Sequence, residues 1–296
     1  MINSDGSLAS SRTPPRALTI AGSDSGGGAG LQADLRTFFA CGVHGTTAVT
    51  AVTVQNSLRV SGVAEIPADV VAAQIETVVQ DIGVQAAKTG MLANAEIITA
   101  VAKACDRVHI GQTGTIPFVV DPVAASMHGD PLLHKDAMQA IVAELFPRAT
   151  IVTPNLDEVA LFTGIDVRTL DDQRAAAAAL IELGARWALV KGGHMRDDPR
   201  CVDLLYDGVT FTELVAERVD TPHTHGGGDT MASAITSALA RGLDVPAAVR
   251  FGKDFVTRSV RHAYPLGAGV GPVSPFWRLA SDDREQLNRD IPGPGS

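Results

Sequence analysis

The hydrophobic and polar positions along the chain follow two periods, and these predict strands and helices in alternation. Short apolar or β-branched runs at 17–20, 46–54, 85–91, 117–120, 149–153 and 186–190 predict buried strands. Apolar residues at intervals of three and four predict helices that begin near 31 and 231, and further helices over 67–82, 93–104, 134–145, 171–184 and 245–262. Repeated strand and helix units are typical of a mostly parallel sheet, so the pattern indicates an α/β protein.

The remaining segments predict a hairpin, two polar ends and a single domain. Strands at 201–206 and 209–215, joined through Asp207 and Gly208, are expected to form the hairpin. Residues 1–16 are polar and predict a disordered leader, and residues 281–296 form a polar tail. Because no repeat or linker divides residues 17–280, we expect them to fold as one domain.

Composition narrows the classes of protein to which the chain can belong. Hydrophobic residues make up 45% and aromatic residues only 4%, so the expected core consists of aliphatic layers of helix on sheet. A net charge of −9 without a basic cluster argues against a nucleic-acid surface, which needs cations to neutralise phosphates. Cys41, Cys105 and Cys201 lack metal-ligand spacing and are expected to be free thiols. Because neither a membrane-length apolar run nor a signal-peptide pattern occurs, we expect a cytoplasmic protein.

The strongest chemical signal is the glycine-rich turn at 223–230, which leads directly into an apolar helix. Glycines let the backbone approach a ligand closely, and the first N–H groups of a helix point outward, so this turn predicts an anion site. Asp229 stands at its mouth. It could accept a proton from an alcohol that attacks phosphorus, or it could only cap the helix, and the stretch alone does not decide between these roles.

A second glycine-rich loop, at 22–30, joins the first strand to the first helix and carries Asp24. It contains no lysine, so it is not a P-loop, and Leu31 stands where the third glycine of a dinucleotide fingerprint would be. Five glycines exceed what a plain turn requires. We therefore expect this loop, or alternatively the segment 126–131, to close over a small ligand.

Polar residues recur where predicted strands end. Gln55, Asp121, Asn155 with Glu158, and Lys191 all follow such strands, at the edge of a parallel sheet where ligands normally bind. Each one alone has a structural explanation as a turn residue or a surface charge. Together with the glycine turn they supply a cation for phosphates, ligands for magnesium, oriented N–H groups and a base, which is the set that phosphoryl transfer needs.

Other chemistries have weaker support. No histidines are spaced as zinc ligands, and His225 is expected to pack against the glycine turn. The Gly-x-Ser-x-Gly motif of many hydrolases is missing from the sequence. A catalytically silent binding protein would be expected to lose Asp229, Lys191 or the glycine turn, and all three are present.

Seven motifs in this order resemble those of the hydroxymethylpyrimidine/phosphomethylpyrimidine kinases of thiamine biosynthesis, within the ribokinase-like superfamily. The resemblance covers residues 17–279. The motifs are 21–34, Thr-Val-Gln-Asn (53–56), Lys-Thr-Gly-Met-Leu (88–92), Asp-Pro-Val (121–123), Thr-Pro-Asn-Leu-Asp-Glu (153–158), Val-Lys-Gly-Gly-His (190–194) and His-Gly-Gly-Gly-Asp-Thr (225–230).

The resemblance implies a ribokinase-like three-layer α/β/α fold that uses ATP and Mg²⁺, and it assigns roles to individual residues. The pyrimidine pocket would be lined by Gly22, Asp34, Gln55, Met91 and Val123. ATP would contact Lys191, Asn155 and Thr224, and magnesium would be held at Glu158 and Asp121. The catalytic set would be Asp229 with Gly226, Gly227 and Gly228, which stabilise charge on the transferring group. Relatives also suggest a homodimer.

One departure from the family pattern concerns Asp229. The family usually carries cysteine there, in a Gly-Thr-Gly-Cys-Thr setting, whereas aspartate is typical of the wider superfamily, including many pyridoxal and sugar kinases. Aspartate supplies an oxygen base for a hydroxymethyl group. The expected activity is phosphorylation of hydroxymethylpyrimidine and then of its monophosphate, and the alternative is a pyridoxal or pyridoxine kinase.

Overall fold

Nine strands form one sheet in the order β3-β2-β1-β4-β5-β6-β7-β8-β9. The computed structural model describes residues 13–124, 135–193 and 199–279. The predicted tail 281–296, the segment 126–131 and residues 1–12 of the predicted leader lie outside these ranges. The strands are β1 (Arg16–Ser23), β2 (His44–Gln55), β3 (Val60–Glu65), β4 (Ala86–Thr89), β5 (Phe118–Val120), β6 (Ile151–Val152), β7 (Ala188–Val190), β8 (Arg200–Tyr206) and β9 (Phe211–Glu217).

The centre of the sheet is parallel and its margins are antiparallel. Strands β2, β1, β4, β5, β6 and β7 run parallel to one another, whereas β3, β8 and β9 pair antiparallel with their neighbours. The carboxyl ends of the six parallel strands therefore meet at one edge. This arrangement confirms the predicted mostly parallel α/β fold, and ligands of such folds bind at that edge.

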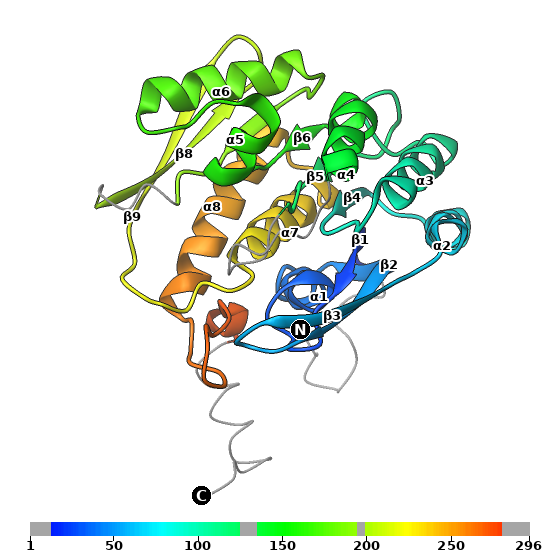
Figure 1. Cartoon of the computed structure of the whole chain (residues 1–296), viewed down its shortest axis with the longest axis horizontal. Coiled ribbons are helices and arrows are strands. Elements are labelled where there is room, and N and C mark those ends of the chain that lie inside the picture. Colours follow the sequence, from blue (N-terminus) through cyan, green and yellow to red (C-terminus); the bar gives the residue numbers. More distant parts are fainter. Residues whose placement is uncertain (1–12, 125–134, 194–198, 280–296) are drawn as a thin grey trace, which may run out of the picture.

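Helices cover both faces of the sheet (Figure 1). They are α1 (Gly30–Ala40), α2 (Ala68–Asp81), α3 (Ala95–Arg107), α4 (Lys135–Ala140), α5 (Leu156–Thr163), α6 (Leu170–Glu182), α7 (Gly227–Ala240) and α8 (Val245–Arg261). One core cluster joins one face of the sheet to α2, α3, α4, α5 and α6, and the other joins the opposite face to α1, α7 and α8. In β1, Leu18 and Ile20 belong to the first cluster and Ala17 to the second, as alternation along a strand requires.

Two elements differ from the sequence prediction. Strand β3 was not predicted, because Val60–Glu65 is a short edge strand that contains a glycine and is largely exposed, so it lacks an apolar run. The predicted helix 134–145 remains α-helical only to Ala140 and continues as a π-helix over Ile141–Leu145. Pro147 follows this segment and offers no N–H to an α-helical turn, which accounts for the wider winding.

The predicted hairpin is confirmed with a longer turn. Strands β8 and β9 pair antiparallel, but β9 begins at Phe211 instead of Val209. The Asp207 carboxylate accepts hydrogen bonds from the N–H groups of Val209 and Thr210 at 2.8 and 2.6 Å, so these two residues belong to the turn.

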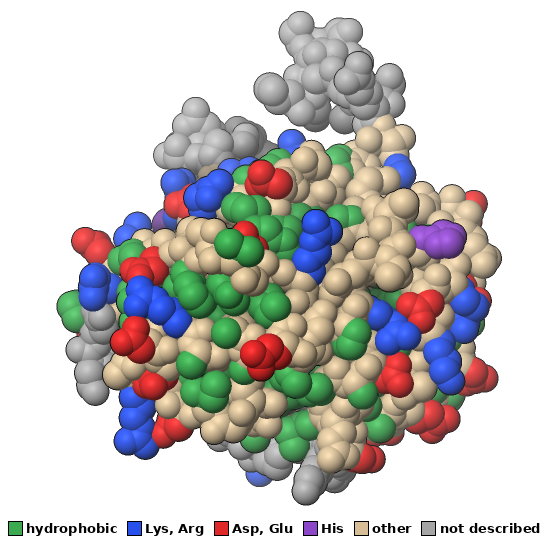
Figure 2. Space-filling view, turned by 90° about the horizontal axis from the view of Figure 1, so that it is seen from above, with side chains coloured by type: hydrophobic (Ala, Val, Ile, Leu, Met, Phe, Trp, Pro, Cys, Tyr) green, Lys and Arg blue, Asp and Glu red, His purple; other side chains and the backbone are tan. Residues whose placement is uncertain are grey.

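The surface carries charges of both signs. On the face shown in Figure 2, Lys and Arg side chains are interspersed with Asp and Glu, with apolar atoms between them. Across 13–124, 135–193 and 199–279, no helix has the length and apolar character needed to cross a membrane.

Candidate active site

The glycine turn lies at the start of α7, where the sequence placed it. Gly226 is the N-cap of α7 and has a φ of 75°, a conformation that favours glycine. A Cβ on Gly226 would also collide with the carbonyl oxygen of Gly28. The Gly227 N–H donates to the Thr224 carbonyl at 3.1 Å, so any anion bound by this turn would rely on the following N–H groups of Gly228 and Asp229.

Asp229 lies in the first turn of α7, with 16% of its side chain exposed. Burial raises its pKa to about 6; Lys88 acts to lower the pKa, Asp34 and Asp121 to raise it, and His225 to lower it. A carboxyl with this pKa is largely ionised at pH 7 and is still basic enough to take a proton from an alcohol during phosphoryl transfer. The structure therefore places a largely buried carboxyl with a raised pKa at the start of α7.

Lys88 lies beneath Asp229 and was not singled out from the sequence. It is fully buried in β4, with its Nζ 2.8 Å from Asp34 Oδ1 and 3.9 Å from Asp229 Oδ1. Burial alone would lower the pKa of Lys88, but the carboxylates of Asp34, Asp229 and Asp121 outweigh this effect and raise it. The sequence did contain a signal, because Lys88 follows two alanines inside a predicted strand.

Lys191 and Asp121 form a second ion pair at the same edge of the sheet. Lys191 follows β7 and Asp121 follows β5, and Lys191 Nζ lies 2.9 Å from Asp121 Oδ1. The Thr153 hydroxyl donates to the same oxygen at 2.9 Å. A Cβ built on Gly228 would lie 3.4 Å from Lys191 Nζ and 3.8 Å from Asp121 Oδ2, so this pair adjoins the first turn of α7.

Asn155 and Glu158 form a capping box at the start of α5. The Asn155 side chain accepts from the Glu158 N–H at 2.9 Å, and Glu158 Oε2 accepts from the Asn155 N–H at 2.8 Å. Burial raises the pKa of Glu158 to about 7; nearby Lys191 acts to lower the pKa and Asp121 to raise it. The capping box thus fixes a buried carboxyl close to the Lys191–Asp121 pair.

The carboxyl groups of Asp121 and Glu158 have the chemistry of a magnesium site. Within the described part of the chain, no three His, Cys, Asp or Glu side chains form a ready metal cluster. Mg²⁺ is commonly held by only one or two carboxylates, with phosphate oxygens and water completing its shell. A buried glutamate whose ionisation is opposed by a neighbouring aspartate is the kind of site that a divalent cation would stabilise.

The loop 22–30 is folded around its own carboxylate. Asp24 accepts hydrogen bonds from the N–H groups of Gly26, Gly28 and Ala29 at 2.8 to 3.0 Å. His225 Nε2 lies 2.9 Å from Asp24 Oδ2. Burial would raise the pKa of Asp24, but the bonds from His225 and the backbone lower it overall. His225 is buried and packs against Gly28 of this loop, so it joins the two glycine segments.

The residues predicted for the pyrimidine pocket lie in different environments. Gly22 and Met91 are neighbours, because a Cβ on Gly22 would lie 2.5 Å from Met91 Cε. Gln55 is half-buried and accepts from the Thr53 hydroxyl at 3.2 Å, and Val123 is also half-buried. Gly90, next to Met91, is close to Asp229, since a Cβ there would lie 3.9 Å from Asp229 Oδ1.

Two predicted ligand contacts are placed differently from the others. Asp34 has no exposed surface, and its carboxylate is bonded by Lys88, Thr19 and Ser233, so it lies beneath the site. The prediction that Asp34 contacts the substrate is therefore corrected. Three buried donors already bind its carboxylate, so Asp34 supports the site from below. Thr224 is exposed, and its carbonyl accepts from Gly227.

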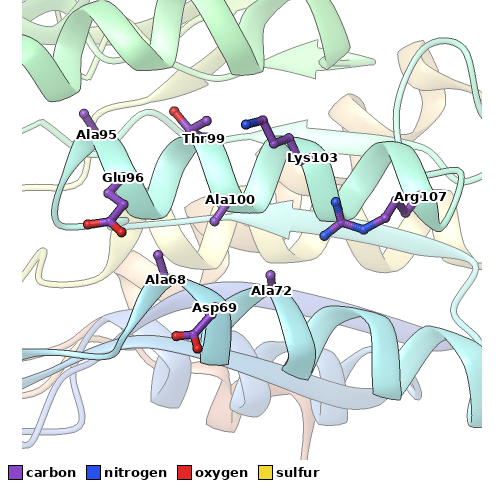
Figure 3. Close-up of a pocket in the computed structure, with 9 residues that line it drawn as sticks. All are labelled: Ala68, Asp69, Ala72, Ala95, Glu96, Thr99, Ala100, Lys103 and Arg107. Atoms are coloured by element: carbon purple, nitrogen blue, oxygen red, sulfur yellow. The ribbon is translucent and has the colours of Figure 1, made fainter.

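Surface hollows lie away from this constellation. One of about 580 Å³ lies between α2 and α3 and is lined by alanines together with Asp69, Glu96, Lys103 and Arg107 (Figure 3). Another of about 430 Å³ lies between β9 and α8. Neither contains a predicted site residue, so the chemistry is marked by converging polar groups and not by these hollows.

The sequence profile of the phosphomethylpyrimidine kinase family matches residues 24–274. This chain belongs to that family. The hydroxymethylpyrimidine/phosphomethylpyrimidine kinase of Mycobacterium leprae is 60% identical over 270 residues, which cover 90% of this chain and 95% of that protein. Family membership makes the chain a kinase, and therefore a phosphotransferase.

Solved structures of related kinases have the same fold. The phosphomethylpyrimidine kinase of Clostridium difficile has a TM-score of 0.72 at 36% identity, covering 83% of this chain and 99% of its own. Staphylococcus aureus pyridoxal kinase in complex with AMP-PCP and pyridoxal has a TM-score of 0.80 at 35% identity, covering 89% of this chain and 94% of its own. Both confirm the ribokinase-like three-layer α/β/α fold, and the AMP-PCP complex supports ATP as the phosphoryl donor in this phosphomethylpyrimidine kinase family member.

Proposed function

We propose that this chain phosphorylates hydroxymethylpyrimidine and then its monophosphate, with ATP as donor, in thiamine biosynthesis. The observation that carries the proposal is the position of Asp229 at the start of α7. It lies 3.9 Å from the Nζ of buried Lys88 and directly follows Gly228, which adjoins the Lys191–Asp121 pair. This puts a base, a cation and helix N–H groups within one small region. The 60% identity to the Mycobacterium leprae enzyme supports the choice of substrate.

In the first step, the substrate hydroxyl attacks the γ-phosphorus of ATP and loses its proton to Asp229. The new oxygen–phosphorus bond forms as the bond from the γ-phosphorus to the bridging oxygen of ADP breaks. Lys191 would neutralise the phosphate oxygens, and the N–H groups of Gly228 and Asp229 would stabilise charge on the transferring group. Gly22, Gln55, Met91 and Val123 would line the pyrimidine pocket beside this point.

Magnesium would be held at Asp121 and Glu158. Bound there, it would neutralise charge on the ATP phosphates. Asn155 fixes Glu158 through the capping box. Asn155 would therefore orient the Glu158 carboxylate in addition to contacting ATP. Thr224, which is exposed in the glycine turn at 223–230, would contact ATP.

The second step makes a different demand on the base. Its acceptor is a phosphate that is already anionic, so positioning matters more than proton removal. Replacing Asp229 by alanine should therefore depress phosphorylation of the alcohol more than phosphorylation of the monophosphate. Equal losses in the two steps would show that Asp229 is not a base.

A pyridoxal kinase activity is the second candidate. It is favoured by the resemblance of Asp229 to the aspartate of pyridoxal kinases and by the fold shared with the pyridoxal complex of the Staphylococcus aureus enzyme. The test is ADP release with magnesium and ATP against hydroxymethylpyrimidine, its monophosphate and pyridoxal, each assayed separately. Turnover of both pyrimidines supports the main proposal, whereas turnover of pyridoxal alone contradicts it.

We also propose that the enzyme is a cytoplasmic homodimer and that residues 17–280 act as one domain. Cys41, Cys105 and Cys201 are free thiols, which suits a reducing compartment. Val63 on the edge strand β3 is 47% exposed, and Val54 on the neighbouring strand β2 is 63% exposed. Exposed apolar edges are common at interfaces. Light scattering after size exclusion should give twice the 30.8 kDa chain mass, and the single mass would contradict the dimer.

A further inference from the structure

Lys88 is a fully buried cation with two carboxylate neighbours. Its Nζ lies 2.8 Å from Asp34 Oδ1 and 3.9 Å from Asp229 Oδ1, and its side chain has no exposed surface. A buried ammonium is unfavourable unless opposite charges and hydrogen bonds compensate for its lost hydration. Asp34 supplies a hydrogen bond and the nearer opposite charge, and Asp229 supplies a second opposite charge that lies at the candidate base.

We propose that Lys88 is a positioning residue that holds Asp229 as an ionised carboxylate facing the acceptor hydroxyl, and that Asp34 fixes Lys88 for this role. The inference rests on the proposed function, in which Asp229 is the base of the first step. It assigns no contact with substrate to Lys88, because that side chain is fully buried.

The surroundings of Asp34 show how Lys88 is fixed. Asp34, on α1, is fully buried and accepts from the hydroxyl groups of Thr19 and Ser233, each at 2.6 Å, in addition to Lys88. Three buried donors leave its carboxylate little freedom to rotate. Lys88 is therefore held from β1, α1 and α7 together.

Helix α7 carries both ends of this network. Ser233 lies four residues after Asp229, so both side chains are on one face of the helix. One contacts Asp34, and the other lies beside Lys88. Ser233 therefore connects helix α7 to the Lys88–Asp34 ion pair, one helical turn after Asp229.

Gly90 lies beside both charges. A Cβ at this position would lie 3.7 Å from Lys88 Nζ and 3.9 Å from Asp229 Oδ1, which are ordinary contacts, and 3.0 Å from the Cβ of Ala21. A side chain at position 90 would therefore border both groups. The backbone N–H of Gly90 is bonded to the Ile20 carbonyl at 2.9 Å, which fixes this spacing.

The charges around Asp229 give the expected direction of the effect. Asp34 and Asp121 oppose its ionisation, as burial does, whereas Lys88, His225 and Lys191 favour it. Because Lys88 is the largest of the favourable contributions, its removal should leave Asp229 protonated at higher pH. A protonated carboxyl cannot accept the proton of the substrate hydroxyl.

The test is the pH profile of kcat/KM for hydroxymethylpyrimidine, with saturating magnesium and ATP, between pH 5 and 9. The variant is Lys88→Met combined with Asp34→Asn, which removes the ion pair without leaving one buried charge alone. The double variant removes one charge that favours ionisation of Asp229 and one that opposes it, and the contribution of Lys88 is the larger of the two. We therefore expect the acidic limb of the profile to move upward, by less than the roughly one to three pH units that the loss of the opposite charge alone would give. Activity at pH 7 should fall and recover at higher pH, while KM for ATP stays the same.

Asp229→Asn separates failure of this inference from failure of the proposed function. If Asp229→Asn abolishes the acidic limb but the double variant leaves the limb unmoved, Asp229 is the base and Lys88 has only a structural role. If Asp229→Asn retains the limb and the rate, the base role fails and the Lys88 inference fails with it.

A measurement on the unaltered protein covers the case in which the double variant does not fold. In a ¹⁵N-lysine-labelled sample, the Lys88 ammonium resonance should shift with pH at the same midpoint as the acidic limb of the rate. A Lys88 resonance that does not respond across this limb overturns the proposal. The resonance is assigned by its absence from the spectrum of the Lys88→Arg variant. If that variant does not fold, the spectrum of Lys88→Met serves the same purpose.

Discussion

Lys191 Nζ lies 2.9 Å from Oδ1 of Asp121, although these residues are separated by 70 positions and follow different strands. Thr153 donates to the same oxygen, so the carboxylate stays hydrogen-bonded even without the lysine. The ammonium itself adjoins the first turn of α7. Lys191 can therefore be tested for a functional role with limited damage to the fold.

Replacement of Lys191 by methionine should lower kcat/KM for ATP about 10²- to 10³-fold, because one fixed cation no longer stabilises the transferring phosphoryl group. Steady-state kinetics with ATP varied would measure the loss. Lys103→Met, in the hollow between α2 and α3, is the matched control and should retain the activity of the parent protein. A Lys191→Met enzyme with unchanged ATP kinetics would contradict the assignment.

The pKa of Asp229, about 6, predicts the pH dependence of the first step. Below that pH the carboxyl is protonated and cannot act as a base, so kcat/KM should fall about tenfold for each pH unit. Above it the carboxylate form predominates and the rate should level off. Rates measured with the alcohol and with the monophosphate should differ here, since only the alcohol must lose its proton at Asp229.

Gly226 and Gly27 form a matched pair for a test of the glycine contacts. Both have positive φ, 75° and 76°, but a Cβ at Gly226 would collide with Gly28, whereas nothing lies within 4 Å of one at Gly27. Gly226→Ala should reduce the free energy of unfolding by about 2 to 5 kcal/mol, through strain and overpacking. Gly27→Ala should cost only the backbone strain, about 1 kcal/mol. Urea unfolding would measure both, and equal losses would contradict the packing argument.

Gly22→Ala should alter substrate binding more than stability. The added Cβ would lie 2.5 Å from Met91 Cε, the flexible end of a side chain, so Met91 must move. We expect KM for hydroxymethylpyrimidine to rise about tenfold, which corresponds to about 1.4 kcal/mol. The double variant with Met91→Ala removes the collision, so its KM should lie below that of Gly22→Ala; a purely additive result would count against contact between the two residues.

The sequence predicted the parts of the site that depend on local chemistry. The glycine turn, the polar residues after strands and the hairpin all follow from runs of a few residues, and the structure has them where they were expected. Asn155 and Glu158 were also expected at the site, as polar residues after a strand and as part of a family motif, whereas the capping box that joins them was found only in the structure. Strand β3 was not predicted, because an exposed edge strand does not need a run of apolar residues.

The buried network could not be predicted in the same way. Thr19, Asp34, Lys88 and Ser233 come from β1, α1, β4 and α7, and no spacing in the sequence indicates that their side chains meet. Asp34 was expected at the substrate because its motif is that of the family, but burial is decided by how α1 and α7 pack. Lys88 offered one cue, a charge that follows two alanines inside a predicted strand.

The bond between Asp24 and His225 spans 201 positions. His225 is itself anchored late in the chain, by backbone bonds to Gly271 and Val273. A nascent chain therefore exposes the first glycine loop to solvent long before its partner has been translated, and its buried carboxylate gains the histidine only at the end of synthesis. A chain that ended before residue 271 would therefore contain Asp24, Lys191 and Asp229 but would lack the backbone bonds that hold His225.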